Sequence, residues 1–486
     1  MNSAARAKSG AGATAKGTKK MPAPAHSRKE PAWDSLEASH ARSLNQRLSD
    51  QGVHTLLAQF TDVHGVAKGK YVPVTKLEEL IHVGAGFAGP SIWGTGLPRT
   101  GPQAEYYARA DPNRIQAIPW MPGYARAVCS GFVDGQPFDA CPRQVLQRAT
   151  ASLAQRGWTL RTGIEPEFFL LKQVDGHWQP ADDADRLDKP SYDLKSLPRQ
   201  AAFLHALHGS LRAWGLDVLQ IDHEDAHGQY EVNFAYDEAL ASADHLMGFK
   251  LAAHALAEQH GMVFSMMPKP FANQPGSGLH FHASLWNEAD ANLFDPYAGA
   301  ARSPDNPVSP LARHFIAGVL HHAPALCALA APTVNSYKRL VVGESLSGTT
   351  WAPAYVAHGP NNRTALVRTL PGRFEWRLPD ASANPYLATA ALIAAGLDGV
   401  DRALDPGPSC TEDLFQLSLD EIRNRKIPVL PQSLGEAVDA LEADPVICSA
   451  LGDTLAREFV RLKRAEWIAY ARHVSDWELQ RYAAAF

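Results

Sequence analysis

One stretch of the chain alternates between apolar side chains and side chains that bind metal ions or donate hydrogen bonds. Residues 279–285 read Leu-His-Phe-His-Ala-Ser-Leu, which is the period-two pattern of a β-strand. In a strand, His280, His282 and Ser284 share one face, and the apolar residues between them share the other. The apolar face suits a core, so we expect the polar face to line a cavity. The glycines before the strand allow the backbone to approach a ligand closely.

Three other segments place acids or arginines on one face of a strand and apolar residues on the other. Their polar residues are Glu165 and Glu167, then Glu224 and Glu231 around a turn, and finally Arg373, Glu375 and Arg377. Paired acids in apolar surroundings are costly unless a cation compensates their charge. One such pair is explained equally well as surface glutamates on an edge strand, but repetition on several strands favours a site. Oxygen ligands with an occasional imidazole suit Mg²⁺ or Mn²⁺.

Arginines in polar segments add a second kind of chemistry. Arg339, Arg363 and Arg368 follow asparagines in segments rich in polar residues. Guanidinium groups suit phosphates and carboxylates, although each arginine alone is most simply a solvated surface charge. Taken with the acids and histidines, they indicate a phosphoryl-transfer site. The sequence has no Walker-type glycine loop, so the strands themselves are expected to hold the nucleotide.

Composition limits what kind of protein carries this site. The chain has 486 residues, 45% of them apolar, and a net charge of −5, of which the first 32 residues contribute about +6. The remaining acidic body argues against nucleic-acid binding. Five scattered cysteines indicate reduced thiols in a cytoplasm. No apolar run is long enough to span a membrane, and the first residues lack the apolar block of a secretory signal.

The elements that must position the site fall into three parts. Residues 1–32 are predicted to be a disordered basic tail, residues 33–141 a small β-rich domain, and residues 142–486 a larger domain of mixed helices and strands. We expect a hairpin at 54–73 and an exposed glycine-rich loop at 84–91. A helix that is interrupted or kinked near Pro324 is expected at 311–329, and a continuous helix is expected at 445–471.

Several segments, taken in order along the chain, resemble the signature motifs of the glutamine synthetase family. They are Gly163-Ile164-Glu165-Pro166-Glu167-Phe168, Glu224 with Gly228-Gln229-Tyr230-Glu231, Lys269-Pro270 with residues 276–284, Asn335-Ser336-Tyr337-Lys338-Arg339, Asn362-Arg363 with Arg368, and residues 373–380 with Asn384-Pro385-Tyr386-Leu387. The resemblance covers about residues 40–480. Residues 84–91 and 222–233 look most like those of type III glutamate–ammonia ligases and γ-glutamylmethylamide synthetases.

The resemblance implies an α+β fold, in which a small N-terminal β-grasp domain precedes a catalytic domain with a curved antiparallel sheet flanked by helices. It also implies a homo-oligomer of stacked rings, expected to be a dodecamer, with each site shared between neighbouring subunits. The implied substrates are ATP, glutamate and either ammonium or a small amine. Two divalent cations, Mg²⁺ or Mn²⁺, would assist γ-phosphorylation of glutamate, after which the amine attacks the acyl phosphate.

The resemblance further implies a role for each matching residue. The first metal would be held by Glu167, Glu224 and Glu231, and the second by Glu165, His280 and Glu375. ATP would face His282, Ser284, Arg368 and Arg373, with Tyr236 near the adenine. Glutamate would be bound by Arg339, Arg377 and Gly276. The expected catalytic residues are Arg363, which would stabilise the transferring phosphoryl group, together with Arg339 and Ser91.

The departures from the family pattern concern the amine. An aspartate that helps to hold and deprotonate ammonium in glutamine synthetases is replaced by Ala88, and Pro275 replaces an asparagine that helps to bind glutamate. The glutamate that closes over ammonium has no secure counterpart, although Glu344 is near its place. We therefore expect a small alkylamine such as methylamine as the acceptor.

Three alternatives remain open from the sequence. The first is an ordinary glutamine synthetase that uses ammonium, with Glu344 in place of the missing acid. The second is a non-catalytic structural or regulatory relative, which would be free to lose the metal ligands that this chain retains. The third is a guanidino kinase on the related catalytic fold, which would lack the N-terminal β-grasp domain.

Overall fold

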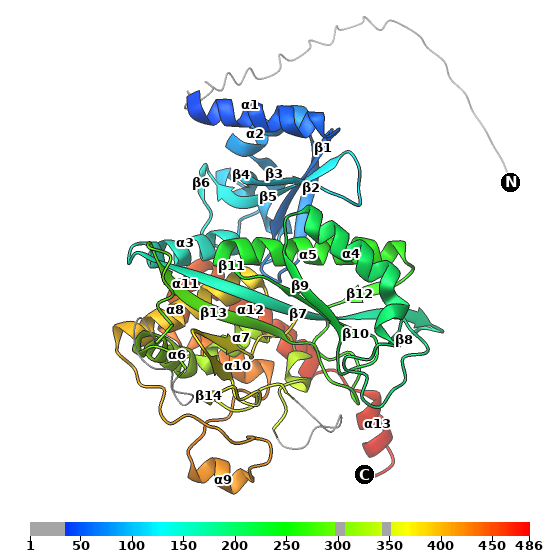
Figure 1. Ribbon diagram of the computed structural model, residues 1–486, viewed down its shortest axis with the longest axis vertical. Helices are drawn as coiled ribbons and strands as arrows, with labels where there is room; N and C mark the ends of the chain where they lie inside the picture. Colours follow the sequence, from blue (N-terminus) through cyan, green and yellow to red (C-terminus); the bar gives the residue numbers. More distant parts are fainter. Residues whose placement is uncertain (1–34, 297–306, 343–350) are drawn as a thin grey trace, which may run out of the picture.

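The computed structural model describes residues 35–296, 307–342 and 351–486. They form two β-sheets, the smaller one near the N-terminus and the larger one below it in Figure 1. The predicted basic tail and Glu344 lie outside the described residues. Among the described residues, no helix combines the length and the apolar character needed to cross a membrane.

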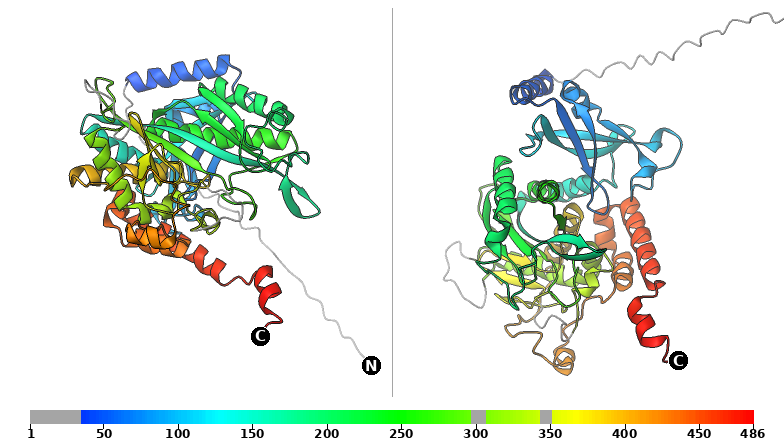
Figure 2. Two further views of the ribbon diagram at one scale, coloured as in Figure 1. Left: turned by 60° about the horizontal axis from the view of Figure 1, so that its bottom comes forward. Right: turned by 90° about the vertical axis from the view of Figure 1, so that its right-hand side faces the viewer.

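The N-terminal sheet has the strand order β2-β1-β5-β4-β3, with β6 paired to β5. Its elements are α1 (Ser35–Asp50), β1 (Thr55–Thr61), β2 (Ala67–Pro73), α2 (Leu77–His82), β3 (Ala85–Ala88), β4 (Glu105–Ala117), β5 (Tyr124–Val133) and β6 (Gln136–Pro137). Helices α1 and α2 cover one face of this sheet (Figures 1 and 2). The predicted hairpin is confirmed, because β1 and β2 pair antiparallel from Thr55 opposite Pro73 to Thr61 opposite Ala67.

The prediction of a plain loop at 84–91 is wrong, because its first half is strand β3 paired with β4. Glycine is needed here for packing against β4. Gly84 has a φ of +95°, and a Cβ on it would lie 2.8 Å from the carbonyl oxygen of Ala108. A Cβ on Gly86 would meet the ring of Tyr107 at 3.4 Å. The glycines therefore allow the strand to pair beside a bulky neighbour.

The larger sheet has the order β14-β15-β16-β13-β7-β10-β9, with β8, β11 and β12 also paired to β7. Its strands are β7 (Trp158–Val174), β8 (His177–Pro180), β9 (Val218–His223), β10 (Gln229–Phe234), β11 (Asp237–Glu238), β12 (Val263–Ser265), β13 (Leu279–Asn287), β14 (His358–Pro360), β15 (Val367–Leu370) and β16 (Arg373–Trp376). All of these pairs are antiparallel except β14 with β15. The predicted fold class of an N-terminal sheet domain and a curved catalytic sheet is confirmed.

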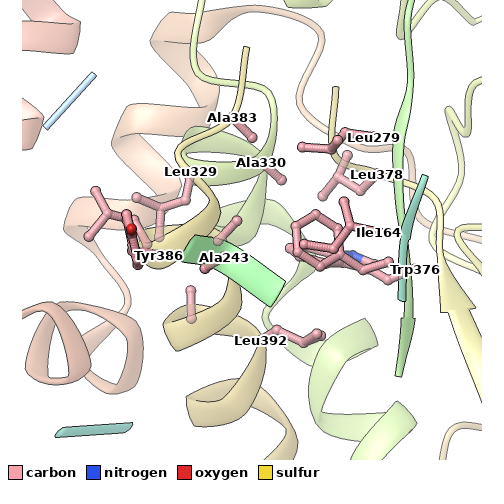
Figure 3. Close-up of a cluster of buried hydrophobic side chains, with 14 of the residues drawn as sticks. Ile164, Ala243, Leu279, Leu329, Ala330, Trp376, Leu378, Ala383, Tyr386 and Leu392 are labelled. Atoms are coloured by element: carbon pink, nitrogen blue, oxygen red, sulfur yellow. The ribbon is translucent and has the colours of Figure 1, made fainter. Parts of the chain in front are cut away.

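Helices pack against this sheet and bury its apolar face. The helices after the N-terminal sheet are α3 (Pro142–Ala154), α4 (Ala201–Ala213), α5 (Ala239–Gln259), α6 (Pro310–His321), α7 (Ala323–Ala330), α8 (Pro385–Asp401), α9 (Leu419–Asn424), α10 (Leu434–Glu442), α11 (Pro445–Leu451), α12 (Asp453–Ala471) and α13 (Asp476–Tyr482). Of these, α9 packs through Ile422 in a separate small cluster, and α13 has no buried residue. Figure 3 shows Ile164, Leu279 and Trp376 of the strands facing Leu392 and Tyr386 of α8. The apolar half of each alternating strand is thus committed to the core, which leaves the polar half for the opposite face.

Two segments predicted to be helical are each divided in the structure. The helix expected at 311–329 breaks at His322, and Pro324 lies in the first turn of α7, where its missing N–H is tolerated. The helix expected at 445–471 breaks at Gly452, which has a φ of +84°. The predicted interruption near Pro324 is therefore confirmed. Helical periodicity continues through Gly452, so it could not reveal the second break.

Candidate active site

Strand register brings the predicted polar residues together. Adjacent strands of the larger sheet place Glu165 opposite His280, Glu167 opposite Glu231, and Glu375 opposite His282. The row crosses β16, β13, β7 and β10, which are neighbours in the sheet. Residues separated in sequence by about 50 to 200 positions therefore share one face, as the alternating patterns predicted.

One half of this row is a cluster of Glu165, His282 and Glu375, whose ligand atoms all lie within 4.8 Å of one another. His282 Nε2 is 3.2 Å from Glu165 Oε1. His280, the predicted imidazole ligand, lies somewhat farther out, with Nδ1 3.9 Å from Glu165 and 3.6 Å from Glu375. Carboxylates and an imidazole at this spacing are suited to a divalent cation.

Glu375 is the most heavily paired member of the row. Its carboxylate accepts a hydrogen bond from Arg368 Nη1 at 2.9 Å and forms a close ion pair with Arg377. Burial would raise the pKa of this carboxyl, but Arg377, followed by His280, His282 and Arg368, lowers the pKa to about 2. Glu375 is therefore a permanent anion at the centre of the cationic part of the site.

The other half of the row is a group of three acids, Glu167, Glu224 and Glu231. Burial is the largest cause that raises their pKa values. Glu165 raises the pKa of Glu167 further, whereas the Gly278 N–H, Arg339 and Arg377 lower it. Neighbouring acids, Glu167 first among them, raise the pKa values of Glu224 and Glu231 further. Glu167 accepts hydrogen bonds from the Gly278 N–H at 2.7 Å and from Gln229 Nε2 at 3.0 Å. These donors hold the carboxylate in place without neutralising the group, so the donor set fits a divalent cation.

Metal ions are expected to stabilise the protein more at high pH than at low pH. The raised pKa values mean that the folded chain binds more protons than the unfolded chain above about 4.5, the ordinary glutamate value. The metal-free protein should therefore lose stability as the pH rises through the raised values. A bound cation favours the ionised acids and should reverse this loss.

The measurement is the melting temperature with EDTA and with Mg²⁺ or Mn²⁺, at about pH 5.5 and about pH 8. We expect the metal-induced increase to be larger at the higher pH. A Glu231→Gln variant should reduce that difference, whereas Glu258→Gln, at an exposed position of α5, should not. An equal increase at both pH values would contradict the assignment of these acids.

A cavity of about 490 Å³ adjoins the Glu165 cluster and is large enough for a nucleotide. Four residues predicted to face ATP or adenine line it: His282, Ser284, Arg373 and Tyr236. Arg373 Nε lies 3.2 Å from His282 Nδ1. Arg368 is not among the lining residues, because it contacts Glu375 and Asn361 instead.

The aromatic end of this cavity holds a residue that the sequence interpretation missed. Trp286 stacks on Tyr236 with ring centroids 6.1 Å apart, and the Arg161 guanidinium lies over the indole ring at 4.3 Å. The indole N–H of Trp286 donates to the Ser284 hydroxyl at 2.9 Å. The alternation of strand β13 could have revealed Trp286, since it continues the polar face of His280, His282 and Ser284.

A second, narrower cavity begins at the Glu167 group and contains Gly276 and Arg339 in its lining. Arg339 is 6% exposed and donates to the Leu378 carbonyl oxygen at 3.2 Å. Arg377, predicted to bind the same substrate, is not among the lining residues and instead pairs with Glu375 and the Trp351 carbonyl oxygen. Gln229 connects Glu167 with Gly276, because its Nε2 donates to the Glu167 carboxylate and also to the Gly276 carbonyl oxygen at 3.1 Å.

Tyr192 was not predicted as a site residue, and the acids that interact with it most strongly are Glu224 and Asp222. Partial burial raises the pKa of its phenol, and Glu224 and Asp222 raise it further, whereas Arg363 lowers it. The side chain is 66% exposed, and its backbone has a φ of +62°. Arg363 is also exposed. A lone tyrosine in a loop gave no periodic signal by which to find it.

The N-terminal loop that contains Ala88 and Ser91 is positioned by other contacts. A Cβ added to Gly89, Gly94 or Gly96 would touch Leu97, Val63 or Glu458 respectively. These contacts lie within the N-terminal domain and with α12 of the same chain, while the acid row lies on the larger sheet (Figure 1). The roles expected of Ala88 and Ser91 therefore stay predictions.

A curved sheet with acids, histidines and arginines on one face, beside a nucleotide-sized cavity, defines a mixed α+β enzyme of the ATP-dependent ligase class. The model of the glutamine synthetase catalytic domain matches residues 139–482. The chain belongs to the glutamine synthetase family. The predicted family and enzyme class, an ATP-dependent glutamate–amine ligase, are confirmed.

Individual relatives cover nearly the whole chain. A glutamate–methylamine ligase of Methyloversatilis universalis is 50% identical over 445 residues, which are 91% of this chain and 98% of the relative. The glutamine synthetase of Halobacterium salinarum is 39% identical, over 92% of this chain and 97% of the relative. A solved structure described as a GmaS/ADP complex is 38% identical, with a TM-score of 0.83, and covers 90% of this chain and 99% of that one.

Proposed function

We propose that the protein joins methylamine to the γ-carboxyl group of glutamate at the expense of ATP. The observation that carries the choice of amine is the 50% identity to a glutamate–methylamine ligase over most of both chains. The glutamine synthetases of Rhizobium meliloti and Halobacterium salinarum are 37% and 39% identical. The replacement of the ammonium-binding aspartate by Ala88 points in the same direction.

The proposed reaction has two steps. The γ-carboxylate of glutamate attacks the γ-phosphorus of ATP, so that ADP leaves and γ-glutamyl phosphate forms. The neutral amine then attacks the acyl carbon, phosphate leaves, and the extra proton passes to solvent or a nearby carboxylate. Divalent cations held by the two acid clusters would neutralise charge on the phosphates. The clusters are Glu167, Glu224 and Glu231, and Glu165 and Glu375 with His280 or His282.

The arginines are proposed to handle the two anionic partners. Arg339, buried beside Gly276, would bind a carboxylate of glutamate, and Arg377 would hold Glu375 and the far side of that pocket. Arg363 reaches the opening where Tyr192 and Glu224 lie, which suits a group that stabilises the transferring phosphoryl. Arg373 and His282 would contact the phosphates of ATP from the nucleotide cavity, while Arg368 would act through Glu375.

The acceptor amine is proposed to bind between Glu224, Asp225 and the rings of Tyr192 and Trp351. Asp225 and Trp351 line the narrow cavity, and the Ser191 hydroxyl hydrogen-bonds to Asp225 and so fixes the loop beside Tyr192. A carboxylate attracts the protonated amine, and an aromatic wall accommodates its methyl group. Burying one methyl is worth about 0.8 kcal/mol, or about fourfold in binding.

The oligomer is proposed to complete this site. Ala88, Ser91 and Trp93 lie on the N-terminal domain, where Trp93 is 59% exposed. In stacked rings of twelve subunits, with sites shared between neighbours, this loop would face the acids of the adjacent subunit. Ser91 would then reach the amine from across the interface.

Steady-state kinetics with ATP and glutamate test the choice of amine. We expect kcat/KM to be higher for methylamine than for ammonium, by up to about fourfold. Ala88→Asp should shift the ratio towards ammonium, because it restores an anion that captures so small a cation. Glu105→Asp, at the neighbouring exposed position on β4, provides a matched control. A wild-type preference for ammonium would reject the proposal, and no effect of Ala88→Asp would mean that the loop does not form the amine pocket.

A further inference from the structure

Asn233 carries a buried amide for which the chain provides no partner. The residue lies on β10 and is 7% exposed, and its Oδ1 is buried without a hydrogen bond. Among the described residues, none provides a hydrogen-bond donor to this oxygen. A buried polar group left unpaired is costly, so native structures almost always supply a partner. Asn233 lines the nucleotide cavity, where a ligand can be that partner.

Its place along the strand indicates which part of the nucleotide it meets. Glu231, of the metal-binding row, and Asn233 share one face of β10, and Tyr236 follows just beyond the end of the strand. A strand rises about 3.3 Å per residue, so Asn233 lies about 7 Å from Glu231 along the chain. The phosphate-binding groups gather at the acid end, and the Tyr236–Trp286 stack marks the opposite end of the cavity. The sugar of a nucleotide spans the distance between those ends.

The chemistry of an amide fits a sugar hydroxyl. The amide has an N–H donor and a carbonyl acceptor, and a hydroxyl can accept from the first or donate to the second. Gln220 lies opposite Asn233 in the β9–β10 pair, is exposed, and lines the same cavity. The two amides therefore present donors and acceptors to one part of the cavity from adjacent strands.

We propose that Asn233, assisted by Gln220, binds the ribose hydroxyls of ATP and makes the enzyme select ribonucleotides over deoxyribonucleotides. This inference rests on the use of ATP in the proposed function. A deoxyribose would leave the buried amide oxygen unpaired again. The loss of affinity would then include the cost of that unpaired group as well as the lost hydrogen bond of the ligand.

The test compares dissociation constants of ATP, 2′-deoxyATP and 3′-deoxyATP by calorimetry, for the full-length protein with Mg²⁺. The wild type should bind ATP about tenfold more tightly than at least one of the deoxy forms. Asn233→Ala should weaken ATP by a similar factor and leave that deoxy form unchanged, so that the preference disappears. Leu219→Ala, which removes an apolar lining residue of the same cavity, should leave the ratio between the two nucleotides unchanged.

Two results overturn the inference. One is equal affinity of the wild type for ATP and both deoxy forms. The other is an equal loss of all three nucleotides in Asn233→Ala, with a melting temperature that matches the wild type. The wild-type ratio is informative even where the variant does not fold. If the wild type binds no ATP at all, or forms no amide from glutamate and any amine, then the proposed function itself fails, which is a separate outcome.

Discussion

Replacing Glu375 by glutamine is expected to lower kcat by about 10³-fold, the order of loss seen when one preorganised charge is removed from an active site. The side chain is 1% exposed and contacts two arginines and a histidine. Glutamine preserves its shape but removes its charge. Arg368 and Arg377 would then face each other's charge without their shared anion, and a carboxylate ligand of the Glu165 cluster would be lost.

Structural checks and a metal-binding measurement distinguish the loss of this chemical role from a folding defect. Circular dichroism and size-exclusion chromatography should show an intact protein for Glu375→Gln, while binding of Mn²⁺ measured by electron paramagnetic resonance should weaken. Glu258→Gln, at an exposed site on α5, serves as the matched charge-removing control and should retain wild-type kcat. Wild-type turnover by Glu375→Gln would show that neither the arginine positions nor the metal ligands depend on this carboxylate.

The acid row could be predicted because its signal is local and repeated. In each strand, residues such as Phe281 and Trp376 must face the core, and strict alternation then fixes the direction of His280, His282 and Glu375. Alternation alone shows that each of these groups lies on the polar face of its strand, without knowledge of the strand order. The family resemblance supplied what alternation could not, namely the curved antiparallel sheet and the expected grouping of these residues around two metal ions. The order of the strands came only from the structure.

Residues in loops and breaks could not be found in this way. Tyr192 lies in a loop after β8, and its place near Glu224 depends on the backbone hydrogen bond from its N–H to the His223 carbonyl oxygen, at 2.9 Å. The break between α11 and α12 depends on the positive φ of Gly452, inside an otherwise continuous helical period. The sequence shows Asn233 on the polar face of β10, but only the unpaired Oδ1 in the structure distinguishes it from an ordinary polar residue.

The junction of the two domains was also invisible in the sequence, because its partners are far apart along the chain. Asp244 of α5 accepts hydrogen bonds from Arg143 Nε and Nη2, both at 2.9 Å, and from the Tyr386 hydroxyl at 2.7 Å. Arg143 also contacts Asp111 of the N-terminal sheet at 2.8 Å. Arg126 of β5 donates to the Asp244 carbonyl oxygen at 3.0 Å. A buried network thus joins the small sheet to the helices that support the larger one.

Asp244→Ala is expected to lower the free energy of unfolding by about 3–5 kcal/mol, because it leaves the buried Arg143 guanidinium without its main counter-ion. Burial lowers the pKa of Arg143, but Asp244, Tyr386 and Asp111 together raise it by more. The guanidinium therefore stays charged and cannot avoid the cost of an unpaired buried charge by losing its proton. The measurement is urea unfolding followed by tryptophan fluorescence at matched protein concentration, since assembly also affects stability. Trp214, 2% exposed beside this junction, should report the change.

Asp401→Ala is the matched control for this experiment. Asp401 also forms a two-point ion pair with an arginine, Arg156, at 2.6 and 2.8 Å, but the two side chains are 52% and 34% exposed. Water can replace the lost partner there, so the cost should stay below about 1 kcal/mol. Because the geometry of the two pairs is similar, the difference between the variants measures what burial adds. Similar losses for both variants would mean that the Asp244 network does not hold the domains together, and that packing of α3 against β1 and β5 does so instead.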